Sequence, residues 1–82
     1  SEQTSKKPIS ISVTKDLRYY VEKKEVPFEE LEPTLKSFIE KAPDLTVVLR
    51  LDQGLMVQDM VNVLQIGVNL KVKMVLATER VK

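Results

Sequence analysis

The chain has 82 residues, of which 43% are hydrophobic and 30% charged, and its 13 basic and 12 acidic side chains leave a net charge of +1. A chain of this length forms one domain and buries only about 60–65% of its unfolded surface. Cysteine and histidine are both missing, which excludes disulfides, thiol nucleophiles, Cys- or His-based metal sites and every Ser-His-Asp triad. The balanced charge and the 5% aromatic content also argue against nucleic-acid binding, for which a basic surface and stacking rings are typical.

The two ends of the chain are polar. Residues 1–8 are expected to form a flexible tether and residues 79–82 a tail, so that residues 9–78 form the folded domain. No apolar run reaches the roughly 18–20 residues of a membrane span, and no signal peptide is visible.

Two strands are expected first. Residues 9–14, ISISVT, alternate apolar side chains with hydroxyls, the pattern of a strand with one buried face. Lys15 and Asp16 supply a turn, and residues 17–22, LRYYVE, predict a second strand. Leu17, Tyr19 and Val21 are expected to share one face of this strand, and the two strands together to make a hairpin.

Two helices alternate with two further strands. The apolar spacing predicts helices over residues 28–42 and from residue 55 or 56 to about residue 70. Residues 46–51 and 72–78 predict strands, the first of them central. The order is β-β-α-β-α-β. The last two strands enclose a helix, so we expect them to lie parallel and to be joined by a right-handed crossover. Both helices should then cover one face of the sheet. The expected fold class is therefore α+β, a two-layer sandwich with two helices on one face of a mixed sheet.

The second predicted helix carries apolar residues over a wide arc. We expect this arc to face the core, and a subunit interface is the alternative, because methionines are common at adaptable interfaces. The seam consists of Val57, Met60, Val61, Leu64 and Val68, widened by Met56, Val63 and Gly67. Opposite lies an uncharged polar stripe of Gln58, Asn62, Gln65 and Asn69. A solvated helix face is expected for this stripe, and a hydrogen-bonding surface for a partner or a glycan is the alternative.

Asp52 directly follows an apolar strand and precedes a helix, a position where enzymes often keep a catalytic carboxylate. A catalytic aspartate needs a second carboxylate, a metal ligand or a base nearby, whereas Asp59 is at least one helical turn away. The surrounding sequence fits neither a metal-binding loop nor a P-loop. We therefore interpret Asp52 as a structural acid at the strand end that accepts hydrogen bonds from loop N–H groups, and we expect no catalytic or metal site.

The first strand is expected to lie at a sheet edge beside the tether, where it can accept a peptide strand or exchange between subunits. The last strand is the other candidate edge, and an ordinary edge strand without a ligand is the alternative. The candidate partner-binding residues of the two strands are Ile9, Ser10, Ile11, Ser12, Val13, Val72, Met74 and Leu76.

The stretches ISISV, RYYV, EELEPTL, PDLTVVLRLD and VKMVLAT, in this order, resemble the periplasmic domain of the ExbD/TolR proteins over about residues 9–78. Two stretches depart from the family's pattern. The region before the last strand reads VNLK where an Ala-Gly pair is common, and the first turn, KDLR, lacks a glycine.

The resemblance implies a subunit of a motor driven by proton-motive force in the inner membrane of a Gram-negative bacterium, without a cofactor. Such a subunit has an N-terminal transmembrane helix, absent from this chain, that sits in an ExbB-like partner. Its periplasmic domain is expected to form a homodimer and to bind an extended segment of a TonB-like protein, and no nucleic acid. The ExbD branch is favoured, and a TolR-like subunit of the Tol-Pal envelope system that contacts peptidoglycan is the alternative. Asp52 matches a strand-end aspartate of the family, not the proton-pathway aspartate of the transmembrane helix.

Overall fold

The computed structural model describes residues 8–77. Most of the expected tether, the expected tail and Thr78 at the end of the last predicted strand lie outside these residues. The described elements are β1 (Ile9–Val13), β2 (Tyr19–Val21), β3 (Lys24–Val26), α1 (Phe28–Lys41), β4 (Thr46–Leu51), α2 (Val57–Leu70) and β5 (Lys73–Ala77).

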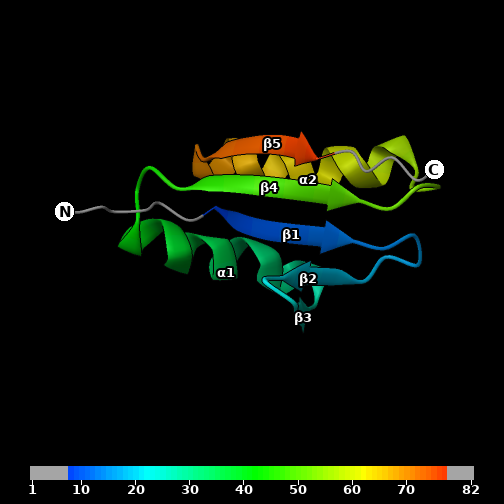
Figure 1. Cartoon of the computed structure of the whole chain (residues 1–82), viewed down its shortest axis with the longest axis horizontal. Helices are drawn as coiled ribbons and strands as arrows, with labels where there is room; N and C mark the ends of the chain where they lie inside the picture. Colours follow the sequence, from blue (N-terminus) through cyan, green and yellow to red (C-terminus); the bar gives the residue numbers. More distant parts are fainter. Residues whose placement is uncertain (1–7, 78–82) are drawn as a thin grey trace.

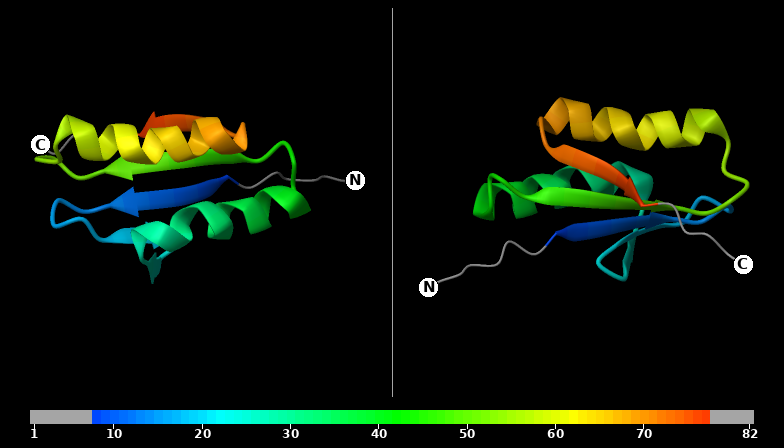
Figure 2. Two further views of the ribbon diagram at one scale, coloured as in Figure 1. Left: turned by 180° about the vertical axis from the view of Figure 1, so that it is seen from behind. Right: turned by 45° about the horizontal axis from the view of Figure 1, so that its top comes forward.

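The strands form one mixed sheet in the spatial order β3-β2-β1-β4-β5. The central strand β1 pairs in parallel with β4, and β4 in parallel with β5, whereas the β1–β2 and β2–β3 pairs are antiparallel. Both helices cover the same face of the sheet, as the view from behind shows (Figures 1 and 2). The predicted α+β sandwich is confirmed, with the short strand β3 added to the predicted order.

The core lies between the helices and the covered face of the sheet. The register pairs Ile11 with Leu49 and Ile9 with Val47, so the alternating apolar residues of β1 and β4 point to the same side. The helices contribute Leu31, Leu35, Val63 and Ile66 to this core. Ser10 and Ser12 stand on the open face, which explains the alternation in β1.

The prediction that the first strand lies at a sheet edge is wrong. β1 is flanked by β2 on one side and by β4 on the other. The ISISV pattern indicates only that one face of the strand is covered. A central strand of a sheet with one open face has the same pattern as an edge strand, so the pattern does not distinguish them. The true edges are β3 and β5.

The second strand is shorter than predicted and is followed by a hairpin. Leu17 lies outside β2, with a φ of 63° and an exposed fraction of 45%, so the prediction that it shares a strand face with Tyr19 and Val21 is wrong. Glu22 and Lys23 connect β2 to β3 with φ angles of 53° and 75°. Two positive φ angles in a two-residue hairpin loop indicate a type I′ turn, whose right-handed twist suits the flanking strands.

The buried side of α2 differs from the predicted seam. Val63, Ile66 and Gly67 face the core, whereas Val57, Val61 and Val68 are 69%, 44% and 67% exposed. Met56, which precedes the helix, is exposed as well. The prediction that the whole arc packs in the core is wrong because the apolar residues of α2 occupy two adjacent sides of the helix, and only one of them contacts the sheet.

Candidate interaction surface at strand β5

Strand β5 has a free edge. Lys73–Ala77 pairs with β4 on one side, and within residues 8–77 no strand pairs with its other side. The opposite edge, β3, has three residues, two of them charged, and Pro27 follows it. Short length, charge and proline all discourage the addition of another strand, whereas β5 has five residues and one charge.

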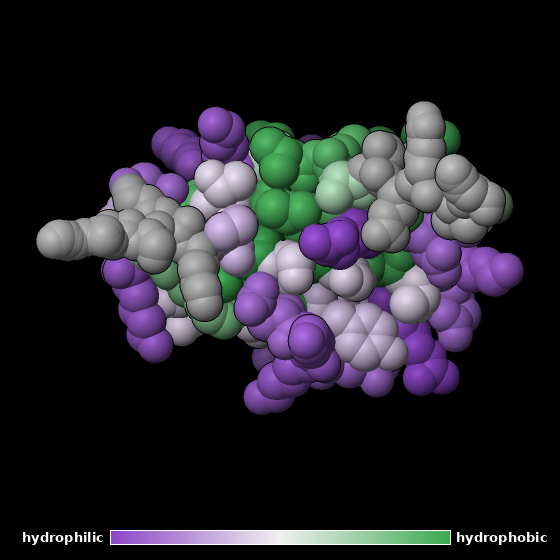
Figure 3. Space-filling model, viewed as in Figure 1, coloured by the Kyte–Doolittle hydropathy of each residue, from purple (hydrophilic) through white to green (hydrophobic). Residues whose placement is uncertain are grey.

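Apolar side chains flank the β5 edge on both faces. The register places Met74 and Leu76 beside Val47 and Leu49, on the covered face, and Val75 beside Val48, on the open face. Leu76 is 54% exposed and Val75 is 39% exposed. Figure 3 shows hydrophobic surface gathered over β4 and β5 on the open face, whereas the surface over β2 and β3 is hydrophilic.

Helix α2 extends this apolar surface. Its residues Val57, Val61, Leu64 and Val68 recur at helical spacing and form what we call the α2 stripe. Leu64 and Val68 line an open pocket of about 410 Å³ next to β5, together with Gly67, Lys71, Val72 and Met74. The second half of the α2 stripe, Leu64 and Val68, therefore lies next to β5.

The contact between α2 and β5 depends on Gly67. A Cβ atom at this position would lie 2.6 Å from the Met74 sulfur, well inside the roughly 3.5–4.0 Å of an ordinary contact. The helix ends at Leu70, and the capping residue Lys71 has a left-handed φ of 58°. The Val72 N–H donates to the Gly67 carbonyl oxygen at 3.1 Å. This is the hydrogen-bond pattern of a helix C-terminus that usually carries glycine.

Beyond its first turn, which contains the half-buried Asp59, helix α2 carries no charge. Residues 60–70 contain neither an acidic nor a basic side chain. The predicted polar stripe is exposed, and its amides bond to each other: Gln58 Nε2 donates to Asn62 Oδ1 at 3.0 Å, and Gln65 Nε2 donates to Asn69 Oδ1 at 3.2 Å. These bonds along the helix leave a surface without a fixed charge, which is typical of the centre of protein interfaces.

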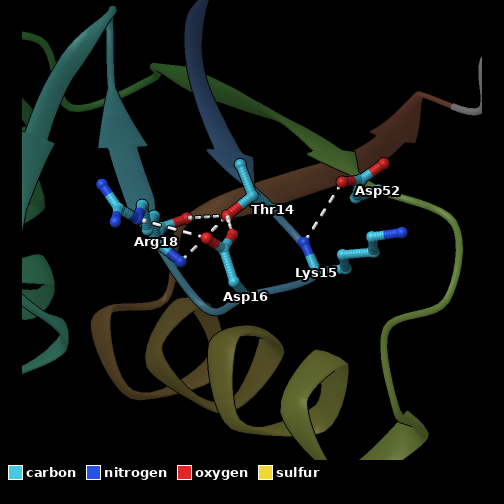
Figure 4. A network of polar contacts seen from close by, with 5 residues as sticks. All are labelled: Thr14, Lys15, Asp16, Arg18 and Asp52. Atoms are coloured by element: carbon cyan, nitrogen blue, oxygen red, sulfur yellow. Dashed lines mark hydrogen bonds and ion pairs between the residues drawn. The ribbon is translucent and has the colours of Figure 1, made fainter.

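Asp52 lies in an exposed loop after β4 and joins two loops (Figure 4). Its N–H donates to the Val13 carbonyl oxygen at 3.0 Å, and its Oδ2 accepts a hydrogen bond from the Lys15 N–H at 3.1 Å. Within residues 8–77 there is no cluster of three or more acidic residues that could hold a metal ion. The contacts of Asp52 therefore tie the end of β4 to the end of β1.

The β1–β2 connection is held by its own side chains (Figure 4). Thr14 Oγ1 donates to Asp16 Oδ1 at 2.6 Å, and Arg18 Nε lies 3.3 Å from Asp16 Oδ2. The Thr14 hydroxyl holds the pKa of the Asp16 carboxyl below its ordinary value, and the Asp16 backbone N–H and Arg18 act in the same direction. All three side chains serve the turn, since they bond to one another.

Tyr19 is the buried aromatic residue of β2. Its ring centroid lies 5.3 Å from that of Phe28, with the ring planes at 55°. Burial raises the pKa of the Tyr19 phenol, and the negative charge of Asp59 raises it further. The ring packs in the core between β2 and the start of α1.

The structure separates the predicted partner-binding residues into two groups. Ile9 to Val13 lie in the centre of the sheet, with Ile11 and Val13 buried, whereas Val72, Met74 and Leu76 lie at or beside the free edge. The α2 stripe lies with the second group. The feature of the sequence that could have indicated it is the run of residues 60–70 without a charge. A membrane-spanning helix needs a longer apolar stretch than either helix within residues 8–77 provides.

A protein-family model described as "Biopolymer transport protein ExbD/TolR" matches residues 1–80 of the chain. A comparison with curated proteins found no match.

Proposed function

Because the chain belongs to the ExbD/TolR family of biopolymer transport proteins, we propose that it is the periplasmic domain of an ExbD-like motor subunit that binds an extended segment of a TonB-like protein along β5. The subunit is anchored in the inner membrane by a transmembrane helix outside this chain, acts as a homodimer, and meets an ExbB-like partner through that helix. Proton flow through the membrane part then energises transport across the outer membrane.

The single observation that carries the binding mode is the free β5 edge with exposed apolar side chains on both faces. An added strand gains main-chain hydrogen bonds along the edge, and its alternate side chains fill pockets that give specificity. The pocket beside Leu64 and Met74 suits an apolar side chain of such a strand. The paired neighbours of β1 leave no room for strand addition at Ile9–Val13.

The test is an amide chemical-shift titration with overlapping peptides from the periplasmic segment of the TonB-like protein encoded in the same genome. We expect shifts in β5 and in the second half of α2, and none in β3. Val75→Lys should weaken binding at least about tenfold, because it places a charge among apolar contacts. Glu25→Lys, which adds a lysine at the β3 edge, should leave binding unchanged.

Two results would contradict the proposal. One is the lack of any shift in β5 with every peptide. The other is binding of peptidoglycan fragments with shifts in Gln58, Asn62, Gln65 and Asn69, which would favour a TolR-like role instead.

A further inference from the structure

The free edge at β5, the outermost strand on its side of the sheet (Figure 1), carries positive charge only. Lys71 and Lys73 are the charged side chains among residues 60–77. Both are exposed, and within residues 8–77 neither forms an ion pair. Lys71 caps the C-terminus of α2, whose partial negative charge offsets the charge of the lysine. Lys73 is therefore the main unbalanced charge at the start of this edge.

Lys73 and Met74 are neighbours that point to opposite faces of the sheet. Met74 is paired with Val47, on the covered face, and lines the pocket of about 410 Å³. Lys73 is paired with Thr46, on the open face, because side chains alternate along a strand. A strand added at this edge therefore meets a mostly apolar pocket on one face and a lysine on the other, at two consecutive residues.

We propose that Lys73 determines which extended segments bind the β5 edge, and that it selects a segment with an acidic residue directly beside the apolar residue held in the pocket. The inference rests on the proposed function, because it names the sequence pattern of the TonB-like segment that binds there. Antiparallel pairing is the more stable per residue. In that direction the segment reads apolar, apolar, apolar, acidic, and these residues lie opposite Leu76, Val75, Met74 and Lys73.

The pattern follows from strand geometry. Residues directly opposite each other in an antiparallel pair point to the same face, with Cβ atoms about 4.5–5.5 Å apart. The residue opposite Met74 therefore points toward α2 and reaches the pocket that Leu64 and Val68 also line. The next residue of the segment lies opposite Lys73 on the open face, where an aspartate or glutamate can pair with the ammonium group.

A lysine at a free edge acts against most added strands. Exposed charged side chains, lysine above all, discourage strand addition, and directly opposed like charges destabilise a pair whereas opposite charges stabilise it. Specificity is a difference of affinities that often relies on such a repulsive element. The apolar contacts of Val75 and Leu76 supply affinity for any apolar strand, so the discrimination between strands falls to Lys73.

Designed peptides test the pattern without knowledge of the natural segment. The probe is a capped peptide with the stretch Ile-Val-Leu-Glu between serines and threonines, titrated into the labelled chain and followed by amide chemical shifts of β5. Replacing its glutamate by glutamine should weaken binding about two- to fivefold, and replacing it by lysine about four- to thirtyfold. The reversed stretch Glu-Leu-Val-Ile places the glutamate opposite Val75 and should bind no better than the glutamine peptide; tighter binding would refute the antiparallel direction.

Variants of the chain assign the preference to one lysine. Lys73→Gln should make the glutamate and glutamine peptides bind equally well, and Lys73→Glu should make the lysine peptide the tightest binder. Lys24→Glu is the matched control, because Lys24 is also an exposed lysine that begins an edge strand, β3, and it should leave the order of the peptides unchanged. Lys71→Gly removes the other positive charge at a left-handed φ, which glycine adopts readily, and should also keep that order.

Failure of this inference and failure of the proposed function give different results. If no designed peptide shifts β5, if the three peptides bind equally well, or if Lys24→Glu changes their order as Lys73→Glu does, the selection by Lys73 is wrong. Binding of TonB-derived peptides to β5 then still stands on its own titration. If the designed peptides bind in the expected order but no TonB-derived peptide binds, the selection by Lys73 stands and the proposed function falls.

Discussion

Gly67→Ala tests how closely α2 approaches β5. The new methyl group would lie 2.6 Å from Met74 Sδ, 2.9 Å from its Cε and 3.0 Å from its Cγ. The substitution itself stabilises the helix, because alanine in a helix interior is favoured over glycine by about 1 kcal/mol. The Met74 side chain, which packs against the core, must move away.

The cost of that movement exceeds the gain. A fully buried methionine contributes about 1.5–3 kcal/mol, and Met74 is half-buried, so its displacement costs about 1–1.5 kcal/mol. A distorted rotamer adds about 0.5–1.5 kcal/mol. We expect Gly67→Ala to lower the free energy of unfolding by about 1 kcal/mol.

The effect should reverse sign once Met74 is truncated. In a Met74→Ala background the three clashing atoms are gone, so Gly67→Ala should raise the free energy of unfolding by about 1 kcal/mol. The double-mutant cycle should therefore give a coupling energy of about 2 kcal/mol. Urea unfolding of the four proteins at one dilute concentration, followed by circular dichroism, measures it. Equal effects of Gly67→Ala in both backgrounds would show that the close approach is wrong.

Further predictions concern the core, the hairpin and two loops. Leu35→Ala should lower the free energy of unfolding by about 2–5 kcal/mol in urea unfolding, because Leu35 is fully buried. Lys23→Gly should raise it by about 0.5–1 kcal/mol by relieving the positive φ, whereas Lys24→Gly in the adjacent strand should lower it; a loss with both would contradict the type I′ turn. Because the pKa of Tyr19 is raised, the folded state keeps the phenol proton to higher pH than the unfolded state does. The free energy of unfolding should therefore fall as pH rises above about 10. Tyr19→Phe should make this fall smaller in unfolding curves measured at different pH. Asp52→Ala should lower the free energy of unfolding by at most about 1 kcal/mol, through loss of its loop hydrogen bond, and leave peptide binding unchanged. A change in peptide binding would contradict the structural role of Asp52.

The sequence allows most elements to be predicted, because their signals are local. Residues 46–51 form β4 with the predicted bounds, and α1 ends one residue before its predicted end. Strand β3 could not be predicted, because its turn uses Glu22 and Lys23 with positive φ and lacks the Asn-Gly or Asp-Gly pair that announces a type I′ hairpin.

The two errors in the candidate site have a common cause. Periodicity says which residues share a side, but not what covers that side. The alternation in Ile9–Val13 holds for a central strand as well as for an edge, and only the parallel pairing with β4, which is a long-range contact, decides between them. Likewise, the apolar residues of α2 fill two sides of the helix, and the position of Gly67 against Met74 decides which of them faces the sheet.

The unequal edges of the sheet set a limit on assembly. If β3 were as long and apolar as β5, the β5 of one copy could pair with the β3 of the next, and each addition would leave a new free edge, as in a fibril. The charged residues of β3 and the proline after it block that head-to-tail growth. A strand added at β5 would therefore end the assembly, so the domain can leave this edge unpaired in solution without forming filaments.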